Sequence, residues 1–365
     1  MTKTRFFLAL LLMLSSAHLV QAADGYGLKE GAVELKSAGP IAFGPEGILF
    51  IGDPQAAAVY AIDTADASGT PATAKYNIEG LQQKLADAIG SSPDQVSVSD
   101  LVVNPASGNV FLLTSVKDGK IGLVKVDATG TITPIALDKI RFSVAAIPNP
   151  PEDKEVGEGK RRKNLRKESI TDIAFMDGKV IVAGLSAAEA PSTVLELAFP
   201  FVATDAGASI EIFHGAHGKY EDFAVVRTFV PFNIGGEMSI LAGFTCTPLV
   251  RFSLEELEAG KKVRGTTLAE LGNQNKPLDM ISYQKGGEDF LLLSNSARGV
   301  MKINTKDLGR EKGLTEPVKE TAGQEYETIA ELKDVVQLDR LNEKNAIVLI
   351  QAEGGPMNLL SVPLP

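Results

Sequence analysis

Residues 100–113, with the sequence DLVVNPASGNVFLL, decide the fold because they contain two apolar runs separated by a turn. The first run, Leu101–Val103, ends at an Asn-Pro pair, and the second, Val110–Leu113, begins after a Ser-Gly-Asn turn. Short apolar runs bounded by Pro, Gly and Asn are typical of neighbouring antiparallel β-strands. The stretch therefore predicts a β-hairpin that begins at Asp100.

The same hairpin pattern recurs along the chain. Three further clear copies start at Pro40, Asp172 and Asp279, and two weaker copies start at Thr228 and Val335. Their first strands begin near residues 41, 101, 173, 229, 280 and 335, about 50–70 residues apart. A regular spacing of this size indicates a repeat protein with six units.

The best-marked unit continues beyond its hairpin. Residues 121–126 and 131–135 form two more strand-like runs around a turn at 127–130. Four antiparallel strands make one blade of a β-propeller. We therefore expect an all-β, six-bladed propeller with four-stranded blades, although the weak fourth unit leaves seven blades open. Because the last unit lacks residues for a fourth strand, we expect Ala32–Ser37 to supply it and close the ring.

The first 22 residues have the pattern of a secretory signal peptide. Lys3 and Arg5 precede an apolar run, and Val20-Gln21-Ala22 suits signal peptidase, so we expect cleavage after Ala22. The remainder, 23–365, is expected to be a single domain in the periplasm or outside the cell. Removal of residues 1–22 takes away two basic residues and no acidic one, which changes the net charge from −10 to −12. Nucleic acid is thus not an expected partner.

The six copies of strand, glycine-containing turn and strand resemble the NHL and SMP-30-type six-bladed propellers. The stretches 170–173, 214–218 and 277–280 are also similar to secreted bacterial propellers with no assigned activity. The chain has no tryptophan, which argues against WD40 repeats. In SMP-30-like propellers a metal ion sits at the channel mouth, which implies that such a site is the first place to look here.

The repeat places three aspartates, Asp100, Asp172 and Asp279, directly before inner strands. Asp53 and Asn295, near the ends of second strands, are expected to approach the same axis. A ring of such oxygens could hold Ca²⁺ and polarise an ester, lactone or phosphate. Alternatively, an aspartate before a strand caps the turn by accepting backbone N–H bonds. The SMP-30-like hydrolases also carry a glutamate early in the first blade, whereas Glu46 is expected on the opposite face.

A second candidate site is His214 and His217, which are the only histidines after processing. Their H-x-x-H spacing, with Glu211 and Glu221 nearby, could bind Zn²⁺ or Cu²⁺, or could be a packed turn. Cys246 is the only cysteine, so no disulfide forms within the chain. It is expected to be a small buried hydrophobe or, near a base, a reactive thiol that points toward the axis.

Long insertions are expected on the face that carries the channel mouth. They include an amphipathic helix within 78–89 and a charged loop with the basic run 160–167, which could dock an anionic partner or remain a solvated loop. Loops on a rigid scaffold concentrate binding residues, so this face is the functional candidate.

Three functions remain open from the sequence. The first is an exported binding module for a small molecule or another exported protein. The second is a metal-dependent lactonase or esterase that uses the channel aspartates. The third is a redox accessory protein that holds copper or iron through His214 and His217. We expect a monomer with no transmembrane segment after processing.

Overall fold

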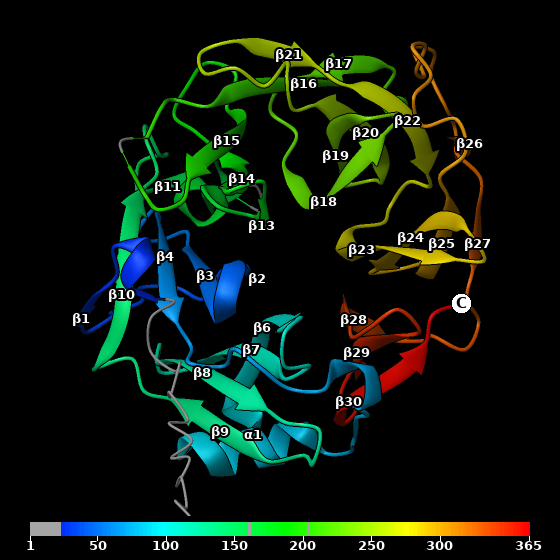
Figure 1. Ribbon diagram of the computed structural model, residues 1–365. Coiled ribbons are helices and arrows are strands. Elements are labelled where there is room, and N and C mark those ends of the chain that lie inside the picture. Colours follow the sequence, from blue (N-terminus) through cyan, green and yellow to red (C-terminus); the bar gives the residue numbers. More distant parts are fainter. Residues whose placement is uncertain (1–22, 160–161, 203) are drawn as a thin grey trace, which may run out of the picture.

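The computed structural model describes residues 23–159, 162–202 and 204–365, and it is a six-bladed β-propeller (Figure 1). The predicted signal peptide, residues 1–22, lies outside the described residues. Each blade is a sheet of antiparallel strands whose first strand lies next to the central channel, and blade 3 also contains one parallel pair, β16 with β21. Among the described residues, no helix has both the length and the apolar character needed to cross a membrane.

The first three blades in chain order have the following strands, from the channel outward. Blade 1 contains β2 (Ile41–Phe43), β3 (Ile48–Asp53), β4 (Ala58–Asp63), β10 (Ile140–Ala146) and β1 (Lys29–Gly31). Blade 2 contains β6 (Val96–Val103), β7 (Val110–Val116), β8 (Ile121–Val126) and β9 (Ile132–Ile135). Blade 3 contains β13 (Asp172–Met176), β14 (Lys179–Leu185), β15 (Ser192–Ala198), β16 (Ala208–His214) and β17 (Lys219–Glu221), with β21 (Lys262–Arg264) added beside β16.

The other three blades follow the same plan. Blade 4 contains β18 (Val226–Ile234), β19 (Glu237–Phe244), β20 (Pro248–Ser253), β22 (Thr266–Leu271) and β26 (Thr321–Gly323). Blade 5 contains β23 (Pro277–Lys285), β24 (Glu288–Asn295), β25 (Gly299–Asn304) and β27 (Tyr326–Thr328). Blade 6 contains β28 (Val335–Arg340), β29 (Asn345–Gln351), β30 (Met357–Pro363) and β5 (Asn77–Ile78).

A few elements lie between the blades. The α-helix α1 (Leu81–Ile89) buries Leu81 and Leu85, which confirms the amphipathic helix expected within 78–89. A small hairpin, β11 (Glu155–Val156) and β12 (Lys163–Asn164), lies in the charged insertion before blade 3. Short 3-10 turns occur at Ala23–Tyr26, Pro45–Gly47, Pro71–Thr73, Pro93–Gln95 and Leu165–Glu168.

The blades are not arranged around the ring in chain order. The inner strand β2 contacts both β6 and β13, while β6 contacts β28, so the order around the channel is blades 2, 1, 3, 4, 5 and 6 (Figure 1). The chain leaves blade 1 after three strands and builds blade 2 between blades 1 and 6. It then returns through β10, which pairs with β4 and completes blade 1.

The core consists of six clusters, one between each pair of neighbouring blades. Side chains of a strand alternate between its two faces, so each second strand supplies two clusters. In β3, Ile48 and Phe50 pack against blade 3, whereas Leu49 and Ile51 pack against blade 2. This alternation explains the continuous apolar runs of the sequence repeat, because both faces of each middle strand are buried.

Closure of the ring differs from the prediction. The edge strand of blade 6 is β5 (Asn77–Ile78), which pairs with β30, and not Ala32–Ser37. The N-terminal strand β1 pairs instead with β10 of blade 1, and the Val33 N–H donates to the carbonyl of Leu137 at 2.8 Å. Edge pairing uses backbone groups alone, so a two-residue edge strand has no side-chain pattern that a sequence could reveal.

Candidate functional site

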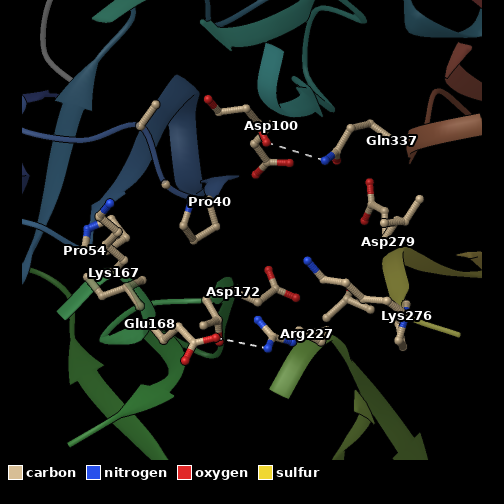
Figure 2. Close-up of a pocket in the computed structure, with 18 residues that line it drawn as sticks. Pro40, Pro54, Asp100, Lys167, Glu168, Asp172, Arg227, Lys276, Asp279 and Gln337 are labelled. Atoms are coloured by element: carbon tan, nitrogen blue, oxygen red, sulfur yellow. Dashed lines mark hydrogen bonds and ion pairs between the residues drawn. The ribbon is translucent and has the colours of Figure 1, made fainter. Parts of the chain in front are cut away.

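The central channel has a cavity at each end, and the cavity on the loop-rich face, here called the mouth pocket, has a volume of about 320 Å³. Three carboxylates, those of Asp100, Asp172 and Asp279, line it together with Gln337 (Figure 2). The same three aspartates also line the cavity of about 440 Å³ that opens on the other face. The predicted ring of aspartates therefore forms the narrow part of the channel.

Each ring aspartate joins two neighbouring blades through its two carboxylate oxygens. One oxygen accepts the N–H of the next residue in its own strand, at 2.9 Å for Asp100 and 2.8 Å for both Asp172 and Asp279. The other oxygen accepts an N–H from the inner strand of the adjacent blade. The donors are Ile41 to Asp100 at 2.7 Å, Phe229 to Asp172 at 2.7 Å, and Leu338 to Asp279 at 2.8 Å. This is the turn-capping role, extended across the blade interface.

A fourth carboxylate, that of Asp339, extends the ring toward the cavity on the other face. It was not predicted. It lies within β28, accepts the N–H of Arg340 at 2.6 Å, and also accepts the N–H of Val103 in blade 2 at 2.7 Å. Gln337 occupies the ring position of blade 6, where its amide nitrogen can donate to Asp100 at 2.9 Å and to Asp279 at 2.8 Å. Both residues lie in the first strand of the weak sixth copy of the repeat, so alignment of that copy would have indicated them.

Burial raises the pKa of every acid in this ring. The pKa of Asp100 rises to about 8, that of Asp172 to about 7 and that of Asp339 to about 6, because protein atoms surround the carboxyl groups and disfavour their charged forms. The pKa of Asp279 is raised first by burial and then by the nearby charge of Asp100. The accepted N–H bonds oppose these shifts without cancelling them. The ring consequently carries protons in the neutral pH range.

Basic side chains stand above the ring at the mouth pocket: Lys167, Arg227 and Lys276 (Figure 2). The guanidinium of Arg227 donates to Glu168 at 3.0 Å and to the hydroxyl of Thr245 at 3.1 Å, which fixes its position. The pKa of Lys276 is lowered, first by burial and then by the positive charge of Arg227. Two cations thus lie close enough to repel each other at the entrance of a protein that is acidic overall.

The sequence indicated only part of this basic group. Lys167 belongs to the predicted basic run 160–167, of which residues 160–161 lie outside the described part. Arg227 lies within the inner strand β18, and Lys276 directly precedes the inner strand β23. Nothing in the linear sequence brings these two single basic residues together. Their position relative to the repeat, one residue before Thr228 and three before Asp279, is the signal that could have found them.

Asp53 and Asn295 are the last residues of β3 and β24, and they do not line the mouth pocket. Asp53 is fully buried, where it accepts the N–H of Lys36 at 2.6 Å and the hydroxyl of Ser37 at 2.6 Å. It thereby ties the N-terminal segment to blade 1. Asn295 accepts from the Asn275 amide at 2.9 Å and donates to the Gly299 carbonyl at 3.2 Å. Both side chains stabilise turns.

The two histidines lie at the outer part of blade 4 and do not line the mouth pocket. Glu221 binds both of them, with 2.9 Å from one of its oxygens to Nδ1 of His214 and 2.8 Å from the other to Nδ1 of His217. Burial lowers the pKa of His214, so its imidazole favours the neutral form. Cys246 was expected to point toward the axis, but it lies beside the histidines.

The ring and the histidine cluster differ in their capacity for a metal ion. Among the described residues, one set of three His, Cys, Asp or Glu side chains has ligand atoms within 4.8 Å of one another: His214, His217 and Cys246. The ring aspartates do not form such a set, and their oxygens already accept backbone N–H groups. Ca²⁺ requires six to eight oxygen ligands. The ring geometry therefore suits blade connection better than cation binding.

Comparison with known proteins gives likeness of architecture only. No protein-family model matches the chain, and no curated protein sequence matches it. Among solved structures, Drosophila Plexin A in complex with Semaphorin 1b is 10% identical, with 93% of this chain and 87% of that chain covered and a TM-score of 0.40. The extracellular region of Plexin A4 is 8% identical with a TM-score of 0.41; 93% of this chain matches half (50%) of that chain.

An enzyme is similar to the chain at the same low level. A putative oxidoreductase (glucose dehydrogenase) from Thermus thermophilus is 12% identical, with 92% of this chain and 100% of that chain covered and a TM-score of 0.36. Likeness at this level says nothing about the activity of the present protein.

Proposed function

We propose that this protein is an exported binding module that takes a small anionic ligand at the mouth pocket. The observation that carries the proposal is that Arg227 and Lys276 both line the entrance of the mouth pocket. The pKa of Lys276 is lowered, first by burial and then by the charge of Arg227. An anion placed between two such cations relieves their repulsion and gains charge-assisted hydrogen bonds.

The floor of the pocket adds a second requirement for the ligand. The ring carboxyls have raised pKa values, and their oxygens face a cavity of about 320 Å³, which is at the small end of ligand sites. Hydroxyl or amino groups of a ligand could donate to these oxygens while its anionic group meets Arg227 and Lys276. A hydroxy acid, a sugar acid or an amino acid has this combination of groups.

Export and kinship with the NHL and SMP-30-type propellers, both predicted from the sequence, are parts of the same proposal. The alternative from the sequence, a metal-dependent lactonase or esterase, would use Asp100, Asp172 and Asp279 as ligands of Ca²⁺. Their bonds to the N–H groups of neighbouring blades weigh against it. Metal analysis of the purified protein tests this alternative directly.

Calorimetric titration with a panel of small hydroxy acids, sugar acids, amino acids and inorganic phosphate tests the binding proposal. We expect one ligand per chain, and binding at least about 10-fold weaker in each of the variants Arg227→Gln and Lys276→Gln. Lys306→Gln is the matched control, because Lys306 follows the end of β25 on the opposite face and is exposed. Flat titrations with the whole panel, or equal affinity in all variants, would overturn the proposal; a protein partner would also leave them flat.

A further inference from the structure

The histidine cluster is assembled from two segments that meet at the outer part of blade 4, the end of β16 with its following turn and the turn between β19 and β20. Strand β16 leaves blade 3 and reaches blade 4, where the Thr267 hydroxyl donates to the carbonyl of Phe213 at 2.7 Å. His214 ends this strand, and His217 lies in the turn that leads to β17. Cys246 comes from the turn between β19 and β20. The three side chains thus meet only in the folded chain.

The imidazoles are oriented by one carboxylate. Glu221, which is 5% exposed, accepts from Nδ1 of His214 with one oxygen and from Nδ1 of His217 with the other. The two ring centroids are 3.9 Å apart. Because each Nδ1–H bonds to the carboxylate, each Nε2 carries the lone pair. Histidines that bind a metal ion characteristically donate their other N–H to a carboxylate in this way.

One of these lone pairs has no partner. Nε2 of His214 is buried without any hydrogen bond, and the residue is only 3% exposed. A buried polar atom that lacks a partner loses its hydrogen bonds to water without replacement, so native proteins contain few such atoms. The adjacent Cys246 places its sulfur within 4.8 Å of the histidine ligand atoms. An ion bound between them would satisfy the orphan nitrogen.

The position of Cys246 is fixed by its backbone. Its N–H donates to the carbonyl of Asn275 at 2.7 Å, and the next residue, Thr247, donates through its hydroxyl to the carbonyl of Gly272 at 2.6 Å. Both Cys246 and Thr247 have positive φ, at 65° and 59°, which side chains other than glycine rarely adopt. The turn therefore fixes the backbone of Cys246, and with it the direction of the Cα–Cβ bond, before any ligand arrives.

We propose that His214, His217 and Cys246 bind one transition-metal ion of the zinc or copper class, with Glu221 as the carboxylate that orients both imidazoles. Two imidazole nitrogens and a thiolate suit Zn²⁺ or copper and not Ca²⁺ or Mg²⁺, which prefer oxygen. Three protein donors leave one tetrahedral position for water or an outside ligand. None of the three ligand residues lines the mouth pocket, although Cys246 neighbours Thr245, which accepts from Arg227.

The geometry needs only a small adjustment to receive the ion. Zn–N distances of about 2.0–2.1 Å and Zn–S distances of about 2.3 Å place tetrahedral donors roughly 3.3–3.8 Å apart. The donors here already lie within 4.8 Å of one another, and the side chain of His217 is 47% exposed and has room to move. The same exposure gives the ion a path from solvent, whereas buried His214 supplies the rigid side.

A rival interpretation is a reactive thiol activated by one histidine. Such a pair needs a single imidazole with an orienting carboxylate. Here the two imidazoles share the carboxylate through their Nδ1 atoms, and one nitrogen of each ring lies within 4.8 Å of the sulfur, which suits a metal site. A packed turn gives no role to the unpaired Nε2 of buried His214.

The test is metal binding by the purified mature chain in the reduced state, with Zn²⁺ measured against a competing chelator and Co²⁺ followed by absorption. We expect one ion per chain and a sulfur-to-cobalt charge-transfer band. Because Cys246 is the only cysteine, the rate at which iodoacetamide alkylates the protein reports on this thiol alone. We expect bound Zn²⁺ to slow that reaction, because a metal-bound thiolate is shielded from the reagent. Cu⁺ competition with Zn²⁺ identifies which of the two metals is held more tightly.

Substitutions distinguish the residues that bind the ion from the carboxylate that orients the imidazoles. Cys246→Ser and His217→Ala, both at partly exposed positions, should weaken Zn²⁺ binding at least about 100-fold and abolish the charge-transfer band or alter it, with the fold checked by circular dichroism. Glu221→Gln should weaken binding about 10–100-fold while the 1:1 stoichiometry remains. Glu211→Gln is the matched control, because Glu211 lies on the same strand but binds Arg264 at 2.6 Å.

Two results would overturn the proposal. The first is a folded wild-type protein that binds neither Zn²⁺ nor copper more tightly than the Cys246→Ser variant. The second is a thiol that His217→Ala makes less reactive while Zn²⁺ leaves its alkylation rate unchanged, which would establish the reactive-thiol interpretation instead.

Discussion

The aspartate ring and the histidine cluster are both polar groups inside the same propeller, yet they differ in how their atoms are satisfied. In the ring, Asp172 accepts one N–H from its own strand and one from the neighbouring blade. In the cluster, Glu221 satisfies one nitrogen of His214 and the other nitrogen remains buried without a partner. The ring is complete without a ligand, whereas the cluster is not.

In a repeat protein, the recurrence of a polar residue helps to distinguish a structural role from a ligand-binding role. The ring aspartates recur at one position of the blade because each blade has the same backbone N–H groups to satisfy. His214, His217 and Cys246 occur once each and belong to no repeat. Recurrence therefore points to a structural role, and a group that occurs once and leaves a buried atom unpaired points to a ligand.

The largest expected effect comes from removing a ring carboxylate. Asp172→Ala should lower the free energy of unfolding by about 3 kcal/mol, because the N–H groups of Ile173 and Phe229 lose their acceptor. Urea denaturation of the variant measures the change. The control is Asp138→Ala, at an exposed position, which should be close to wild type. A wild-type midpoint for Asp172→Ala would contradict the structural role of the ring.

A metal ion should stabilise the protein through the cluster alone. At a free Zn²⁺ concentration 100 times the dissociation constant, the free energy of unfolding should rise by about 2.7 kcal/mol, because the ion binds the folded chain only. Thermal denaturation with and without Zn²⁺ measures this gain. Asp172→Ala should retain the gain and Cys246→Ser should lose it. An equal response of the two variants to Zn²⁺ would contradict binding at the histidine cluster.

The ring should make stability depend on pH. Folding raises the pKa of Asp100 to about 8 and that of Asp172 to about 7, so their contribution is present below the unfolded pKa near 4 and is lost as the pH rises through these values. Asp100 and Asp172 are only half-buried and line two open cavities, which reduces the cost of their charged forms, so we expect a decrease of about 1–2 kcal/mol between pH 5 and pH 8. Denaturation at fixed ionic strength checks it, and Asp172→Asn should flatten the slope. Stability that rises over this interval would contradict the raised pKa values.

The smallest expected effect concerns the bridge between two ring acids. Gln337→Leu removes the amide that can donate to both Asp100 and Asp279, and should cost roughly 0.5–1.5 kcal/mol. The cost should be larger at pH 8 than at pH 5, because a larger share of Asp100 is charged there and accepts the amide more strongly. Denaturation at pH 5 and pH 8 measures this difference, and equal costs at the two pH values would show that the amide does not bridge the acids.

The inner strands were predictable because each precedes a middle strand whose apolar run is buried on both faces, and this pair of strands recurs along the chain. All six predicted strand starts fall within or beside β2, β6, β13, β18, β23 and β28. The exchanged order of blades 1 and 2 was not predictable, because every blade offers a similar apolar surface to its neighbours. Which surfaces meet depends on the crossovers at β5 and β10, whose pairing is made by backbone groups.

The candidate sites were predictable to different degrees. The repeat indicated Asp100, Asp172 and Asp279 at the channel, and the H-x-x-H spacing indicated His214 and His217. The sequence did not connect Cys246 with the histidines, because they come from different blades.

By itself the sequence determined the repeat, the all-β class, the six inner strands and the residue types available for chemistry, because these depend on local hydrophobic period and turn residues. Only the tertiary structure decided the blade order, the strand that closes the ring, and the meeting of Cys246 with two histidines at blade 4. These features arise from contacts between segments far apart in the chain. The free energies of these contacts depend on which strands pair and on how close distant segments come in the fold. No single stretch of residues encodes either property.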